Sequence, residues 1–223
     1  LPSVTDVFLH MFYLQDLMLL DPVISVVFWT LCLEVQFYLF YIVLLWSSQK
    51  ISYSNSTLIS SLVALGLGIY SLCLDLGIAE NQIKGLFISS WHYFLMGVLA
   101  SHAVQGLRHS QTILIVWLLI EITGQLSMEV KAYAVAGICS SAGIYIMWKF
   151  GVLDRMFCNK PVLYLGTISY TLYLLHPDIG WKVISVGKLL LGEDISPTQA
   201  GLLLLAGIFA SIVAAHIFHV LLE

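Results

Sequence analysis

Long apolar runs separated by short polar stretches make up most of the chain. A helix needs about 20 mostly apolar residues to cross a bilayer, and runs of that order recur along the sequence. The strands of a transmembrane barrel would be about ten residues long and would alternate between apolar and polar positions, which these runs do not. The pattern therefore predicts an all-α protein, a polytopic transmembrane helical bundle with roughly seven or eight membrane segments. We expect one domain over residues 1–223.

The expected segments follow from where the runs begin and end. A weak segment over 1–20 comes first, and Pro22 then starts a helix that reaches about Trp46, because proline is well tolerated in a first helical turn. A polar loop over 47–56 follows. The later membrane segments are expected at 57–78, 85–107, 111–125, 130–150, 162–176 and 197–222. Pro177 is expected to stop the sixth helix, and 181–191 to form a separate amphipathic or re-entrant piece.

Composition supports the membrane interpretation and excludes other classes. The chain is 60% hydrophobic and 10% charged, whereas a soluble domain carries about a quarter charged residues. The net charge of −4 provides no basic surface for nucleic acid, so no nucleic-acid partner is expected. The four cysteines show no CxxC spacing, so neither a disulfide framework nor a zinc site is expected.

Glu34 is the most unusual residue of the first strong apolar run. An ionised carboxylate within a membrane helix costs roughly 2.5–3.5 kcal/mol, so such a residue normally faces a partner, a polar cavity or a substrate. The helical period places Thr30, Tyr38 and Tyr41 on the same face as Glu34. This polar stripe predicts either the wall of a substrate groove or a hydrogen-bonded contact with a neighbouring helix.

A second polar face lies far downstream. Gly166, Ser169, Tyr173 and His176 follow one another at helical spacing, and Pro177 comes directly after the histidine. An imidazole in this position can accept or donate a proton near neutral pH. Taken alone, the residues favour a structural hydrogen bond at the membrane interface over a catalytic role.

Three other sites are less specific. His92 follows Trp91, a pairing typical of membrane interfaces, so we favour a structural role for it. Glu121 is a second carboxylate within a membrane segment, and its role is open. His216, His219 and Glu223 share metal-ligand spacing, but no neighbouring cluster completes a site, and no metal is expected.

Two motifs resemble those of a known family. The run from Trp29 to Tyr38 (W-T-L-C-L-E-V-Q-F-Y) resembles the W-[ST]-L-x-x-E-x-Q-F-Y signature of the integral membrane acyltransferase-3 family. The run from Ser169 to His176 (S-Y-T-L-Y-L-L-H) resembles the later S-Y-x-x-Y-L-x-H motif of that family. Phe94 to Gly97 fits its F-x-x-G helix, and the resemblance covers essentially the whole chain.

The resemblance implies a membrane-bound O-acyltransferase. Such an enzyme moves an acyl group, most often acetyl, from acyl-CoA to a hydroxyl of a carbohydrate or lipid-linked sugar. Acyl-CoA is then a co-substrate, with no permanently bound cofactor, and the partners are the lipid bilayer, the acyl-CoA donor and the glycan acceptor. The expected location is the bacterial cytoplasmic (inner) membrane.

The resemblance also suggests roles for residues. Glu34 and His176 are the candidate catalytic residues, and the candidate substrate-binding residues are Trp29, Tyr38, Ser169 and Tyr173. Glu34 would orient a partner or bind the acceptor hydroxyl, while His176 would help proton movement in the same cavity. The best-known essential histidine of the family lies in its first helix, in a motif that nothing here matches. We therefore expect a piece that lacks the first helices of the domain, with the presumed catalytic base upstream and no activity by itself.

Two rival interpretations remain open. Intramembrane carboxylates and histidines would equally suit the proton relay of a secondary transporter or flippase-like carrier. Many such carriers have inverted repeats, which this sequence does not show. A noncatalytic scaffold is the third possibility, and the sequence upstream of this chain would test it.

Overall fold

The structure is a computed structural model that describes residues 3–12, 14, 18, 27–80, 85–128, 130–192 and 195–222. Within these ranges the regular structure is helical and no strand is present. The chain divides into two compact units, which we describe separately: unit 1 comprises essentially 3–21 and 29–156, and unit 2 comprises 22–28 and 157–223. A single domain over 1–223 stays a prediction.

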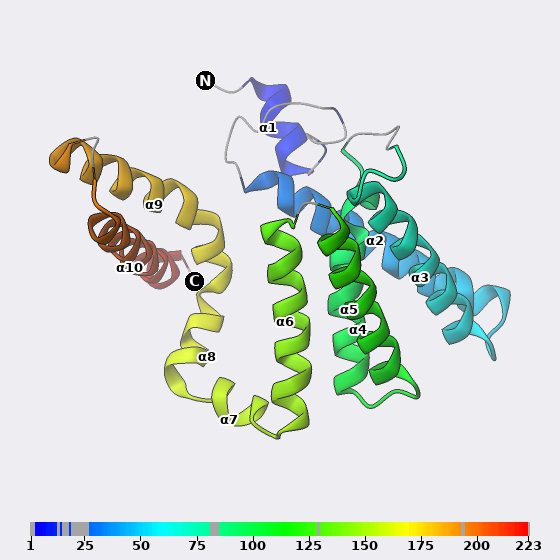
Figure 1. Cartoon of the computed structure of the whole chain (residues 1–223). Helices are drawn as coiled ribbons and strands as arrows, with labels where there is room; N and C mark the ends of the chain where they lie inside the picture. Colours follow the sequence, from blue (N-terminus) through cyan, green and yellow to red (C-terminus); the bar gives the residue numbers. More distant parts are fainter. Residues whose placement is uncertain are drawn as a thin grey trace. The chain divides into compact units, whose positions relative to one another are not determined.

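Unit 1 is a helical bundle built around α4 (Figure 1). Its elements are α1 (Val4–Met11), α2 (Phe28–Ile51), α3 (Ser56–Asp75), the 3₁₀ turn η1 (Phe87–Ser90), α4 (Trp91–Val104), α5 (Ser110–Ser127) and α6 (Ala132–Lys149). Helix α4 packs against α3, α5 and α6, and its buried residues, from Trp91 to Ala103, lie along one broad face. That face makes α4 the central helix of the unit.

Aromatic side chains attach α2 to this core. Phe37 stacks on Phe94 of α4 with ring centroids 4.7 Å apart, and Phe40 meets Trp91 edge-on at 5.0 Å. The Trp91 indole donates a hydrogen bond to the Ala64 carbonyl of α3 at 2.9 Å. Three helices are thus joined around one buried tryptophan.

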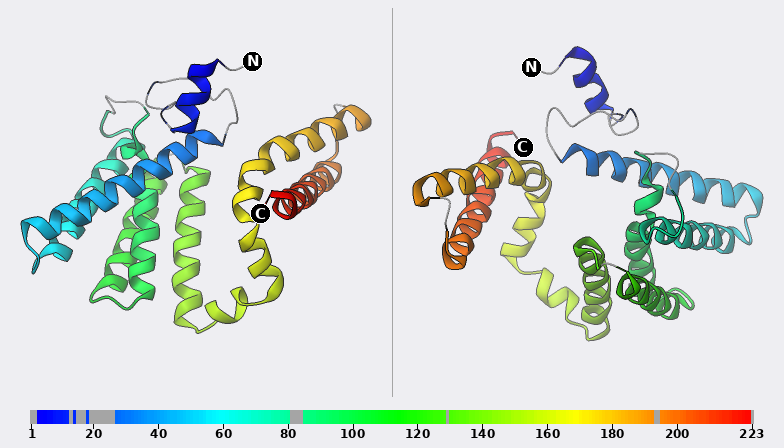
Figure 2. Two further views of the ribbon diagram at one scale, coloured as in Figure 1. Left: turned by 180° about the vertical axis from the view of Figure 1, so that it is seen from behind. Right: turned by 45° about the horizontal axis from the view of Figure 1, so that its top comes forward.

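Unit 2 consists of α8 (Lys160–Thr167), α9 (Ser169–Leu191) and α10 (Pro197–Leu222), with α9 and α10 packed along each other (Figure 2). The short helix α7 (Leu153–Phe157) lies at the boundary of the two units. The backbones of α9 and α10 approach closely where glycines face each other: a Cβ added to Gly207 would lie 3.4 Å from the Gly180 carbonyl oxygen. Small residues at such crossings are typical of membrane helices, because they let two backbones come together.

The opening segment is only partly described. Helix α1 has eight residues and starts with a capping box, in which Ser3 and Asp6 satisfy each other's backbone N–H groups. The hydrogen bonds from Ser3 hold the pKa of Asp6 below its usual value. Pro22, predicted to start the next helix, lies outside the described residues.

Several predicted boundaries are wrong in an instructive way. Helix α2 continues to Ile51 and α3 begins at Ser56, so the loop predicted over 47–56 covers only residues 52–55. The predicted helix 162–176 is broken after Thr167, and α9 runs through Pro177 to Leu191, so the predicted stop and the separate piece over 181–191 are both wrong. A helix tolerates an internal proline when a neighbouring group satisfies the carbonyl that the proline leaves free.

Four helices of the described chain are long and apolar enough to cross a membrane: α2, α3, α5 and α10. The all-helical prediction is confirmed for these residues, whereas the count of seven or eight segments is not established. Helix α4 has only 14 residues and is covered by its neighbours.

Candidate active site

Among the described residues, α9 and α10 line a groove in unit 2. It has a volume of about 910 Å³, and most of its wall is apolar. Its polar positions are Ser169, Tyr173, His176, Asp178, Lys182 and Ser211. The structure thus brings together three residues singled out in the sequence, Ser169, Tyr173 and His176, because they repeat at helical spacing along α9.

Pro177 determines how the His176 ring is held. An ordinary residue at 177 would donate its N–H to the carbonyl of Tyr173, four residues earlier, but proline has no N–H. His176 Nδ1 bonds to that same carbonyl at 2.8 Å. A carbonyl oxygen only accepts, so Nδ1 must carry the proton, and in the neutral ring Nε2 holds the free lone pair. The proline therefore selects a tautomer in which Nε2 is the nitrogen able to accept a proton.

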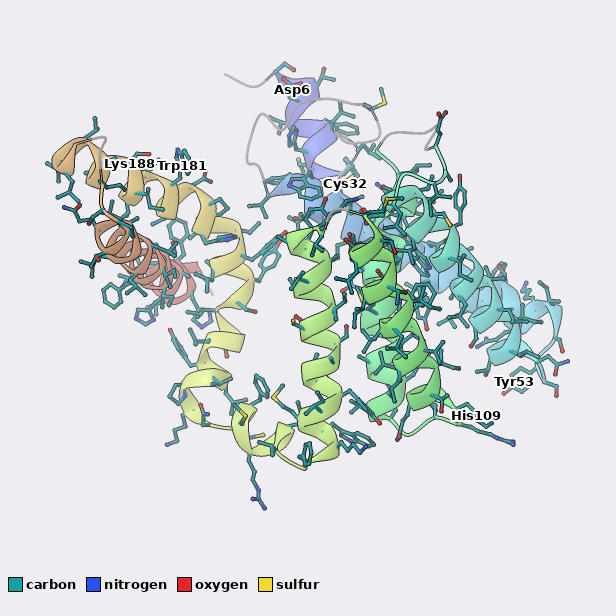
Figure 3. All side chains as sticks on the ribbon, in the orientation of Figure 1. Asp6, Cys32, Tyr53, His109, Trp181 and Lys188 are labelled. Atoms are coloured by element: carbon teal, nitrogen blue, oxygen red, sulfur yellow. The ribbon has the colours of Figure 1, made fainter. Side chains whose placement is uncertain are left out.

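The groove also has an aromatic rim. Trp181, labelled in Figure 3, lies one turn beyond Pro177 and is 72% exposed. The sequence analysis did not select it as a binding residue. The helical periodicity of α9 could have placed Trp181 beside His176. The sequence analysis missed this because it expected the helix to stop at Pro177.

Glu34 and Tyr38 form a hydrogen-bonded pair on α2 in unit 1. The Tyr38 hydroxyl donates to Glu34 Oε1 at 2.9 Å, one helical turn away. Both side chains are exposed, as is Trp29 at 46%. The prediction that Glu34 shares a cavity with His176 stays a prediction, since the two residues belong to different units.

The other face of the same motif is structural. The Gln36 side chain donates to the Gly85 carbonyl at 3.1 Å and accepts from the Phe87 N–H at 3.0 Å. Phe37 lies beside it against Phe94. These contacts anchor the chain that leads into η1, a role that the sequence analysis did not assign to Gln36.

A buried polar cluster forms where α3 ends, α4 begins and α5 ends. At its centre, Asp75 Oδ2 accepts from the Tyr93 hydroxyl at 3.1 Å and from the Gln125 amide at 3.2 Å, while Oδ1 pairs with Lys131 Nζ at 2.7 Å. His92 Nε2 lies 3.8 Å from Asp75 Oδ2. Asp75 therefore links four elements of unit 1.

The cluster superficially suggests a nucleophilic triad. Ser71 Oγ lies 2.8 Å from His92 Nδ1, and the far nitrogen of that ring faces Asp75. Ser71 and His92 are nevertheless fully buried, so no substrate reaches the hydroxyl. Glu121 is equally buried beside them, and the structural role favoured for His92 agrees with this position. The sequence indicates this cluster only through Asp75, His92 and Glu121, three titratable residues in apolar segments. Only the fold shows that these residues meet.

Residues 3–220 match a family model described as an acyltransferase domain. The chain belongs to this acyltransferase-3 family. No curated protein and no solved structure matches it. Together, the family and the long apolar helices indicate an integral membrane acyltransferase.

Proposed function

We propose that the protein transfers an acyl group, most plainly acetyl from acetyl-CoA, to a hydroxyl of a carbohydrate or lipid-linked sugar. The proposed setting is the bacterial cytoplasmic membrane. The family supports acyl transfer in general, and the α9–α10 groove supports the choice of a hydroxyl acceptor.

The observation that carries the proposal is the hydrogen bond between His176 Nδ1 and the Tyr173 carbonyl. It leaves Nε2 as the acceptor of a residue that lines the groove. Transfer of an acyl group to a hydroxyl requires a group that removes the hydroxyl proton as the oxygen attacks the carbonyl carbon. In this proposal His176 takes the role of the base that the resemblance placed upstream of this chain. The new C–O bond forms, the thioester C–S bond breaks, and the proton passes through the imidazole to the departing thiolate.

The remaining groove residues suit a sugar. The exposed indole of Trp181 offers an aromatic face for a sugar ring, and Ser169 and Tyr173 offer hydroxyls to its oxygens. The acceptor would enter along the groove with one hydroxyl at His176. On α2, the Glu34–Tyr38 pair would bind the acceptor or orient a partner residue.

The test uses the purified full-length protein with labelled acetyl-CoA and a panel of membrane glycans. We expect His176→Ala to reduce transfer by roughly 100-fold or more, the usual contribution of a general base. Glu34→Gln should reduce it by a smaller factor. Lys188→Gln is the matched control, because Lys188 is an exposed residue of α9 that does not line the groove. Normal transfer by both His176→Ala and Glu34→Gln would refute the proposed roles, and no acylated product from any acceptor would refute the proposed function.

A further inference from the structure

A second cavity lies within unit 1, at the end where α2 and α4 finish and α3 and α5 begin. It has a volume of about 220 Å³ and is lined by side chains of all four helices. Tyr53 and His109, labelled in Figure 3, mark the two loops at this end. Three of the four helices are long and apolar enough to span a membrane, and the ends of a spanning helix lie at the bilayer–water interface.

The lining of this cavity is divided by polarity. Its apolar part includes the buried side chains of Ala64, Leu95 and Leu99. Its polar part contains an unusual number of hydroxyl groups, from Ser48, Ser56, Thr57, Ser60, Ser61 and Ser110. A site with both characters suits an amphiphile, whose apolar portion contacts one part while its polar portion contacts the other.

The buried hydroxyls donate to the backbone and keep the capacity to accept hydrogen bonds. Ser48, Ser60 and Ser110 each donate their proton to a backbone carbonyl of the preceding turn, with oxygen–oxygen distances of 2.8, 3.1 and 2.5 Å. A hydroxyl that donates in this way still has lone pairs that accept. The wall therefore favours a ligand with N–H or O–H groups near its polar end.

The rim of the cavity is positive. Arg108 belongs to the lining, whereas Lys50, next to the lining residue Gln49, has its ammonium 4.4 Å from the centroid of the Trp46 ring. Residues 47–56 and 104–111 contain no Asp or Glu, and in the described part of the chain the carboxylate ion pairs are all made by Asp75, at the opposite end of α3. Of the Arg108 donors, Nε bonds to His109 Nε2 at 2.9 Å. The positive charge of Arg108 thus has no carboxylate partner there, and a guanidinium is well shaped to bind phosphate.

We propose that this cavity binds a phosphate-bearing amphiphile whose hydroxyl or amide groups lie next to its phosphate. Two sources share this chemistry: an anionic phospholipid with a hydroxylated head group, and a phosphorylated thioester donor with an amide-containing arm. Arg108 binds the phosphate, the serine oxygens accept from the adjacent donors, and the apolar part holds the chain beyond them. No residue is shared between the lining of this cavity and that of the α9–α10 groove, and ligand binding in the cavity does not depend on acyl transfer.

Binding is measured by titration calorimetry on the full-length protein in a phosphate-free maltoside detergent, without any acceptor. The probes are a short-chain phosphatidylglycerol and coenzyme A. We expect at least one probe to bind, and Arg108→Gln to weaken it roughly tenfold, as expected for one charge-assisted hydrogen bond. Lys149→Gln is the matched control, since Lys149 is an exposed cation at the C-terminal end of α6 outside the cavity lining; we expect a change below twofold.

A second variant separates shape from charge. Ser61→Leu keeps Arg108 and fills part of the cavity from a half-buried position, so it should also weaken binding while leaving the melting temperature nearly unchanged. Binding of phosphatidylglycerol alone identifies a lipid site, and binding of coenzyme A alone identifies a donor site. The proposal is overturned if neither probe binds, if Lys149→Gln weakens binding as much as Arg108→Gln, or if Ser61→Leu binds like the unchanged protein. Because no acceptor is present, failure of acyl transfer leaves these outcomes unaffected.

Discussion

Unit 1 and unit 2 use the same kinds of polar residue in opposite ways. In unit 1, His92 and Glu121 are fully buried around Asp75, and helices from four parts of the chain enclose them. In unit 2, His176 is exposed on a groove formed by only two helices. The same side-chain chemistry therefore stabilises a bundle where it is enclosed, and it is available to a substrate where a groove exposes it.

The largest effect on stability is expected from a change at Asp75, the charged residue at the centre of the buried cluster. Asp75→Asn removes the partner of Lys131 and disturbs three further polar contacts. Loss of one partner of a largely buried pair costs about 3 kcal/mol, and the partial exposure of Lys131 places the expected loss at the lower end of the known range. Chemical unfolding in detergent would measure it. A stability like that of the unchanged protein would contradict the structural role.

The next test concerns packing in the core of unit 1. A Cβ added to Gly68 of α3 would lie 2.4 Å from Leu95 Cδ2 and 2.8 Å from the Trp117 ring, so Gly68→Ala should destabilise unit 1 by about 1–3 kcal/mol. Gly66→Ala is the matched control on the same helix, because nothing lies within 4 Å of its added Cβ. Helix propensity predicts that the control is stabilised by up to about 1 kcal/mol. Equal melting temperatures for the two variants would show that the packing at Gly68 is not tight.

In unit 2, a change at Pro177 should have a smaller effect, lowering the transfer activity without lowering the stability. Pro177→Ala restores an N–H that competes with His176 for the Tyr173 carbonyl, so the imidazole loses its fixed tautomer. We expect transfer activity to fall roughly tenfold, about 1.4 kcal/mol, while thermal stability is kept or increased. Activity and melting temperature are measured on the same samples. Full activity in this variant would show that the proline does not position the histidine.

The smallest effect is expected at the exposed pair on α2. Tyr38→Phe removes the hydrogen bond to Glu34 Oε1 while it keeps the ring contact with Phe94. Because the pair is exposed, the free energy of unfolding should change by less than about 1 kcal/mol. Gln36→Ala, on the opposite face, should cost more, since it leaves the Gly85 carbonyl and the Phe87 N–H without their partner. The reverse order would contradict the assignment of the two faces.

Much of the helical framework could be predicted from the sequence. Helix α10 has the predicted bounds, and α3, α5 and α6 begin and end within a few residues of the predicted positions. The two motifs also indicated the acyltransferase family that the family model confirms. These features are local, because apolar run length and helical period depend on neighbouring residues alone.

What the sequence by itself determined is therefore the membrane character, most helices, the family and the shared face of Ser169, Tyr173 and His176. The tertiary structure decided which polar residues meet: Asp75 finds His92, Gln125 and Lys131 across four elements. It also decided that α9 continues through Pro177, since His176 bonds the carbonyl that the proline leaves free. The physical reason is that a buried polar atom must find a partner somewhere, and a chain of mostly apolar helices offers many candidates until packing selects one.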